Sequence, residues 1–209
     1  MAAPSVPTGQ VAFFTKADYS GDKHSYNIGD DKNLYPGSLN DSFNSAVVAY
    51  DTKVLAWQHA NSSGVYKELE GENPSLSALG GLSRFKVIGN DVRVIAFKFT
   101  DETGGSARQY SLKLNAADVG EKILYSNEDD EFKLVGTIGE TGPPVTTAIY
   151  LRNEHTGQYL SVGSVFFQWN AKTKQVDIVS NENFPKQLKE ERTGPSKFVL
   201  TLISNKPSE

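Results

Sequence analysis

The chain has 209 residues, 38% hydrophobic and 22% charged, with a formal net charge of −4 at pH 7. This composition is typical of a folded globular protein with one long domain or two small ones, and it excludes a disordered chain. The net charge is negative, and the sequence has no basic patch of the kind that nucleic-acid binding requires. The absence of cysteine excludes disulfides, thiolate metal sites and cysteine nucleophiles.

Residues 1–9 form an N-terminal extension with neither a basic nor an apolar stretch. No apolar run in the chain approaches the length of a membrane span. We therefore expect a cytoplasmic protein, a monomer, with no membrane or nucleic-acid partner. The sequence does not identify a protein partner.

Residues 10–89 contain one pattern twice: an aromatic residue ends an apolar run, a glycine follows, and a serine later opens another run. The residues are Phe14, Gly21 and Ser45 in the first copy, and Trp57, Gly64 and Ser83 in the second. Strand-like runs fall at 11–15, 25–28, 45–50, 54–57, 65–69 and 84–88, with one short helical turn within 75–82. Such duplication predicts a β domain of two motifs, 10–52 and 53–89.

The three repeated residue types have a common physical explanation. Glycine adopts a positive φ where the chain folds sharply back on the strand. The aromatic ring covers the folded hairpin, and the serine hydroxyl bonds a backbone group that the fold leaves unpaired. The pattern therefore predicts a tightly folded hairpin in each copy.

Residues 90–209 form a second domain in which no further copy of the pattern occurs. Strand-like runs fall at 92–99, 109–114, 122–125, 132–138, 147–151, 159–169, 176–179 and 198–203, and a helical turn is expected within 183–191. About eight short strands in this length predict an immunoglobulin-like β-sandwich. Within it, Phe167 and Trp169 should share one strand face, as core, while Phe166 takes the other.

The repeated residues resemble the paired Greek-key motifs of the βγ-crystallin superfamily. The stretch Tyr19-Ser20-Gly21 matches the aromatic-x-Gly end of that signature, whereas Ser62-Ser63-Gly64 departs from it. The resemblance covers residues 10–89 and implies a double Greek-key domain. The chain combines this domain with an unrelated β domain and has no cysteine. In this combination it is similar to a fungal member of the superfamily.

The resemblance also implies a calcium-binding segment, Asn/Asp-Asn/Asp-x-x-Ser/Thr-Ser, before the last strand of each motif. The first motif reads Asn40-Asp41-Ser42-Phe43-Asn44-Ser45. By resemblance, Asn44 replaces the hydroxyl ligand, and backbone carbonyls near Ser42 and Gln58 complete the clamp. Because amide and carboxylate oxygens also cap turns, calcium is expected to bind weakly or not at all.

In the second motif the same segment reads Ala78-Leu79-Gly80-Gly81-Leu82-Ser83. Only the serine keeps a side-chain oxygen, and the resemblance assigns it a structural role. This half-site is therefore expected to bind no calcium.

Other candidate chemistry is sparse. His24, His59 and His155 have no companion at metal-ligand spacing, and no nucleophile elbow or phosphate loop occurs. The acidic run 128–131 is expected to be a solvated turn, as is the mixed-charge segment around Lys186, Lys189 and Arg192. The sequence therefore favours a non-enzymatic, stable structural, storage or stress-related protein. A calcium-binding module and a glycan- or protein-binding role for the second domain are the alternatives.

Overall fold

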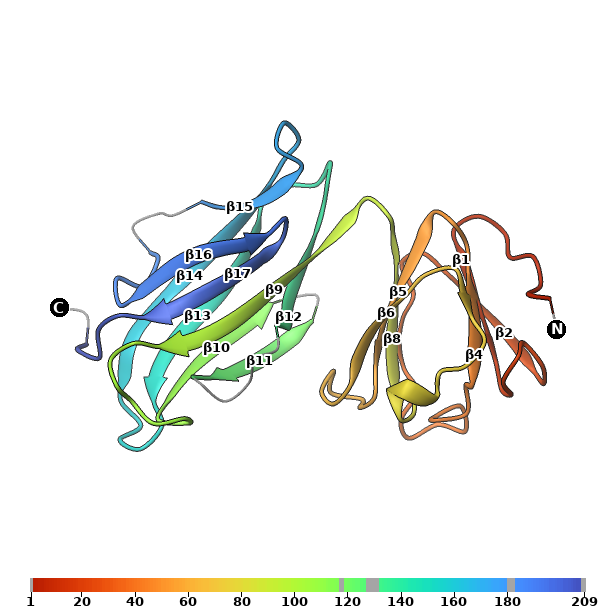
Figure 1. Ribbon diagram of the computed structural model, residues 1–209, viewed down its shortest axis with the longest axis horizontal. Helices are drawn as coiled ribbons and strands as arrows, with labels where there is room; N and C mark the ends of the chain where they lie inside the picture. The colour runs from red at the N-terminus through yellow and green to blue at the C-terminus, as the bar shows by residue number, and fades with distance from the viewer. Residues whose placement is uncertain (1, 117–118, 127–131, 180–182, 208–209) are drawn as a thin grey trace. The chain divides into compact units, whose positions relative to one another are not determined.

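Strands make up almost all the regular structure of this chain, as expected from the sequence. The computed structural model describes residues 2–116, 119–126, 132–179 and 183–207. The chain divides into two units, Met1–Asn90 and Asp91–Glu209, each built from its own sheets (Figure 1). The predicted all-β class is confirmed.

The first unit consists of two four-stranded sheets, with orders β2-β1-β4-β7 and β3-β8-β5-β6. The strands are β1 (Gln10–Phe14), β2 (Lys23–Asn27), β3 (Asp31–Asn33), β4 (Ser45–Val48), β5 (Thr52–Trp57), β6 (Tyr66–Leu69), β7 (Glu72–Asn73) and β8 (Arg84–Gly89). The short 3-10 helix η1 (Ser77–Leu79) lies within the predicted helical turn. Each repeat gives its third strand to the other repeat's sheet, since β3 pairs with β8 and β7 with β4. The two repeats therefore form one domain.

Aromatic rings from both repeats meet in the core of this domain. Phe13 stacks on Phe43 at a centroid distance of 5.0 Å and lies 4.9 Å from Phe85 of the second repeat. All three side chains are buried. A smaller cluster beside this core packs Phe14 against Tyr19, edge to face at 6.1 Å. The aromatic of the repeated pattern thus covers its own hairpin, as predicted.

The second unit is a sandwich of a five-stranded sheet, β11-β10-β13-β14-β15, and a four-stranded sheet, β12-β9-β17-β16. Its strands are β9 (Val92–Asp101), β10 (Tyr110–Ala116), β11 (Gly120–Tyr125), β12 (Lys133–Gly139), β13 (Val145–Asn153), β14 (Tyr159–Asn170), β15 (Gln175–Val179), β16 (Leu188–Gly194) and β17 (Lys197–Leu202). All pairs are antiparallel except β17 with β9, which is parallel. The predicted sandwich is therefore present.

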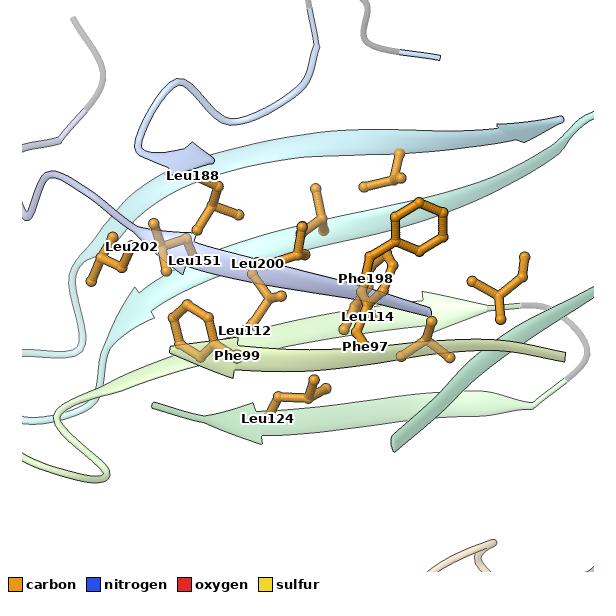
Figure 2. Packing of buried hydrophobic residues seen from close by; sticks show 14 of the residues in the cluster. Phe97, Phe99, Leu112, Leu114, Leu124, Leu151, Leu188, Phe198, Leu200 and Leu202 are labelled. Atoms are coloured by element: carbon orange, nitrogen blue, oxygen red, sulfur yellow. The ribbon is translucent and has the colours of Figure 1, made fainter. Parts of the chain in front are cut away.

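Side chains from both sheets fill the core of the second unit (Figure 2). Phe97 lies 5.6 Å from Phe167 of the opposite sheet and 5.9 Å from Phe198 on the neighbouring strand. Phe167 is fully buried, and Trp169 packs against the same cluster. The predicted sharing of one face by these two residues is confirmed, and Phe166 takes the other face.

Three strands were not predicted, and the helical turn predicted within residues 183–191 was wrong. Residues 188–194, expected to be part helical turn and part loop, form β16 at the edge of its sheet, paired with β17. Strands β3 and β7 are short and polar, so no apolar alternation marked them. In each case pairing with a neighbouring strand decides the conformation, which local sequence does not reveal. The acidic run 128–131 lies outside the described residues.

Candidate functional site

The two folded hairpins of the first domain depend on their glycines. Gly21 has φ +79° and Gly64 φ +75°, the left-handed region predicted for both. A methyl group on Gly21 would also lie 2.5 Å from the Thr15 hydroxyl oxygen. Glycine is therefore required for both conformation and space.

In the first repeat, the serine closes the hairpin as predicted. The Ser45 hydroxyl accepts a hydrogen bond from the Tyr19 backbone N–H at 3.0 Å. It donates one to the Lys16 carbonyl at 2.7 Å. Ser45 is fully buried; its bond with the Tyr19 N–H is buried too, whereas its bond with the Lys16 carbonyl is partly buried.

In the second repeat, the strand register assigns the serine a different place. Phe14 lies opposite Ser45, but Trp57 lies opposite Arg84. The backbone N–H of Ser83 donates to the Trp57 carbonyl at 3.2 Å. The equivalent bond in the first repeat comes from residue 44, at 2.8 Å to the carbonyl of residue 14. Ser83 is therefore the structural counterpart of Asn44, and the sequence alignment that paired it with Ser45 was shifted by one residue.

Arg84 occupies the position of the closing serine in the second repeat. Its guanidinium lies 5.7 Å from the Trp57 ring centroid, within range of a cation–π contact. It also bonds both carboxylate oxygens of Asp31, at 3.2 and 3.1 Å. A charged side chain thus covers the second aromatic, and this residue was not identified from the sequence.

The predicted calcium ligands fall into two groups. In the first, the Asn44 side-chain amide donates to the backbone carbonyls of Thr15, at 2.9 Å, and Ser42, at 3.1 Å. A cation here would require the amide to turn its oxygen toward those carbonyls. This group holds no carboxylate, so its affinity for a divalent ion should be low.

The second group joins the two repeats. Asp41, at φ +56°, accepts a hydrogen bond at 3.4 Å from the Ser83 hydroxyl onto Oδ1. Its backbone N–H donates to the Leu82 carbonyl at 3.1 Å. A methyl group on Gly81 would lie 2.5 Å from the same carboxylate oxygen. The carboxylate of the first repeat is therefore packed against the segment that was expected to bind no metal.

Gln58 and Asn40 border this second group. A methyl group on Gly80 would lie 2.9 Å from Gln58 Nε2, so the Gln58 side chain flanks the glycine bend that Asp41 also touches. The Gln58 Oε1 atom accepts a hydrogen bond from the backbone N–H of Val65 at 3.1 Å. Asn40 donates to the other oxygen of Asp41 at 2.6 Å. All five predicted residues thus lie at one of the two groups: Ser42 and Asn44 at the first, and Asn40, Asp41 and Gln58 at the second.

The second group, which we call the Asp41–Ser83 junction, offers one carboxylate and one hydroxyl. Hard cations such as Ca²⁺ prefer oxygen donors of this kind. The donors fit a calcium ion chemically, but a single charge and few side-chain oxygens limit the affinity. Within the described residues, no three His, Cys, Asp or Glu side chains gather at a metal-binding distance. Ser83 was missed as a candidate ligand because only strand pairing reveals its register.

In the described part of the chain, no helix has the length and apolar character needed to span a bilayer. A family model described as "Beta/Gamma crystallin" matches residues 8–89, and a family model described as "Membrane binding" matches residues 95–203. The second match runs against our expectation that the chain has no membrane partner. None of the curated proteins compared with the chain matches it.

Two solved structures of one fungal protein are similar to this chain. The abundant perithecial protein of Neurospora crassa is 51% identical, with a TM-score of 0.90, over 98% of this chain and 100% of that one. A βγ-crystallin domain of the same Neurospora protein, solved in its Ca²⁺-bound form, is 43% identical. That likeness has a TM-score of 0.42 and covers 44% of this chain and 100% of that domain.

Proposed function

Because the chain belongs to the βγ-crystallin superfamily and, within it, to the family of the fungal abundant perithecial protein, we propose that it is a non-enzymatic structural or storage protein. The observation that carries the proposal is that polar side chains of the first domain bond other groups of the same domain. Ser45 bonds the backbone of a folded hairpin, and Arg84 covers an aromatic ring and pairs with Asp31. These groups stabilise the fold.

Long-lived stability is the property that such a role requires. Both domains contain strand pairings between distant segments, which fold slowly, and the proposal adds that their stability is partly kinetic. The chain has two tryptophans, Trp57 in the first domain and Trp169 in the second. Each ring packs against its own domain, so each reports the unfolding of that domain by fluorescence.

The test is unfolding in concentrated denaturant, followed by fluorescence of the Trp57→Phe and Trp169→Phe variants. The proposal predicts that both domains unfold over hours or longer when extrapolated to water. Unfolding within seconds at 25 °C would contradict a storage role. A hydrolase activity that copurifies with the protein and vanishes on substitution of one side chain would contradict the non-enzymatic assignment.

Calcium binding at the Asp41–Ser83 junction is a second candidate function. The observation that favours it is the meeting of a carboxylate from one repeat with a hydroxyl from the other, 3.4 Å apart. A cation held there would link the two repeats and stabilise the first domain by mass action. Calorimetric titration of calcium into metal-free protein tests it, and an absence of binding heat at millimolar calcium would rule it out.

Attachment to a membrane surface is a further candidate, supported by the family match over residues 95–203. It requires no spanning segment, because a protein can bind a bilayer from one side. Co-sedimentation of the full chain with phospholipid vesicles tests it. Protein that stays in the supernatant with all vesicles would overturn it. The glycan-binding alternative stays a prediction, which a glycan array would test.

A further inference from the structure

The outer face of the five-stranded sheet exposes apolar side chains that the core does not use. Among the described residues of the second domain, Val162 is 62% exposed, Tyr159 50% and Val179 44%. Exposed hydrophobic residues scattered singly are ordinary, whereas neighbouring ones on one face indicate a contact surface. Their positions in the sheet are therefore decisive.

Strand register shows that these side chains share a face. Residues directly opposite each other in an antiparallel sheet point to the same side. Val162 lies opposite Tyr150, Tyr159 opposite Arg152, and Phe166 opposite Val179. We call Tyr150, Tyr159, Val162, Phe166 and Val179 the outer-sheet patch.

The intervening residues on β13 and β14 confirm the division of faces. Ile149, Leu151 and Val165 alternate with the patch residues and are buried in the core between the sheets. The patch therefore lies on the side of the five-stranded sheet that faces away from β9 and β17. One face of the sheet packs the domain, and the other presents aromatic and branched side chains.

Cations border the patch at its aromatic end. The Tyr150 and Tyr159 rings meet at 6.3 Å, and the Arg152 guanidinium lies 5.8 Å from the Tyr159 ring centroid. Lys113 of β10 lies directly opposite Tyr150. Each cation also has an acidic neighbour, Arg152 at 3.5 Å from Glu154 and Lys113 at 3.8 Å from Glu121. The border therefore combines amphipathic rings with paired charges and is not strongly basic.

We propose that the outer-sheet patch is the surface by which the second domain lies on a phospholipid bilayer. The proposal rests on the membrane-binding function above and names the face that performs it. Tyrosine rings and aliphatic side chains are suited to the boundary between headgroups and acyl chains, and bordering Arg and Lys side chains to the lipid phosphates. Because the cations are paired, apolar insertion supplies most of the binding, so neutral phosphatidylcholine should support it.

The test is co-sedimentation of the full chain with phosphatidylcholine vesicles and with mixed phosphatidylcholine–phosphatidylserine vesicles. Val162→Asp and Tyr159→Ser should lower the partition coefficient about tenfold and severalfold, respectively, on both. Val65→Asp and Tyr50→Ser are matched controls, because these residues are 39% and 83% exposed in the first domain. Both controls should bind like the wild type. Urea unfolding of each variant separates loss of binding from loss of folding.

The outcomes separate the two proposals. If the wild type binds neither kind of vesicle, the membrane-binding function itself fails. If the wild type binds and Val162→Asp binds equally well, the function stands and the outer-sheet patch is the wrong face. Binding only to anionic vesicles, abolished by salt, would also overturn the patch. Sedimentation velocity tests whether a second copy of the chain covers the patch instead. A dimer that Val162→Asp dissociates would make the patch an interface between two copies and would overturn the proposal.

Discussion

The carboxylate of Asp41 lies 3.4 Å from the hydroxyl of Ser83, although 42 residues separate them in the sequence. Each residue belongs to a different repeat, and the exchange of β3 and β7 between the sheets brings the repeats together. The junction between the repeats is therefore built from unlike parts, a carboxylate from one copy and a hydroxyl from the other. The two repeats share one arrangement of strands, and the differences between their sequences determine which donors meet.

Ser45→Ala should destabilise the first domain. The substitution removes the hydroxyl that accepts from the Tyr19 N–H, which is buried, and donates to the Lys16 carbonyl, where the bond is partly buried. We expect a loss of about 1–3 kcal/mol in the free energy of unfolding. Urea unfolding followed through Trp57 measures it, with the exposed Ser38→Ala as control. Equal midpoints for the two variants would contradict the role of Ser45.

Gly21→Ala should cost more stability than Gly29→Ala, although both glycines have a positive φ. The methyl group on Gly21 meets the Thr15 hydroxyl, whereas one on Gly29 meets nothing within 4 Å. Gly29→Ala should lose about 1 kcal/mol from backbone strain alone, and Gly21→Ala about 1–3 kcal/mol. The difference between the two midpoints in urea isolates the steric contribution. A larger loss at Gly29 would refute it.

Tyr66 should make the first domain sensitive to alkali. Burial, reinforced by the nearby Glu68 carboxylate, raises the pKa of Tyr66 well above its ordinary value of 10.0. The unfolded state therefore releases this proton more readily, so the stability is fully present below pH 10 and falls as the pH rises further. The slope should approach about 1.4 kcal/mol per pH unit. Tyr66→Phe should flatten it in urea unfolding at neutral and alkaline pH, and parallel slopes would be inconsistent with this origin.

In the second domain, Gly163→Ala should disturb the packing of Asn183 against β14. An added methyl group would collide with the carbonyl oxygen of Asn183. It would thereby strain the hydrogen bond that the Ser164 N–H donates to that oxygen at 3.0 Å. We expect about 1–3 kcal/mol of destabilisation, read through Trp169. Gly139→Ala, whose methyl would meet only ordinary contacts, is the control and should change the midpoint little.

The repeated aromatic, glycine and serine pattern predicted the first domain well, because positive φ and hairpin burial are local requirements. Gly21, Gly64 and Ser45 have the roles that their residue types suggested. The role of Ser83 could not be read from the sequence, because it depends on strand register. Aligning Ser83 with Ser45 makes it a structural serine, whereas aligning it one residue earlier, with Asn44, makes it a candidate ligand.

The second domain illustrates the same limit. Its buried strands were predicted from apolar runs, but β16 carries Lys189, Glu190, Glu191 and Arg192 at a sheet edge and gave no strand signal. Its pairing with β17 is a tertiary effect. The outer-sheet patch was also missed, since Phe166 and Val179 become neighbours only through the pairing of β14 with β15.

Calcium titration of three metal-free proteins, the wild type, Asp41→Asn and Asn44→Ala, tests most directly what the meeting of the two repeats at the Asp41–Ser83 junction does. Asn tolerates the positive φ of residue 41, so Asp41→Asn removes the charge with little strain. The account predicts that the wild type binds with a dissociation constant on the order of 10⁻⁵ M or weaker. It also predicts that Asn44→Ala binds similarly and that Asp41→Asn loses at least about tenfold in affinity. Equal affinity of the wild type and Asp41→Asn, or loss of binding only in Asn44→Ala, would contradict the Asp41–Ser83 junction as the calcium site.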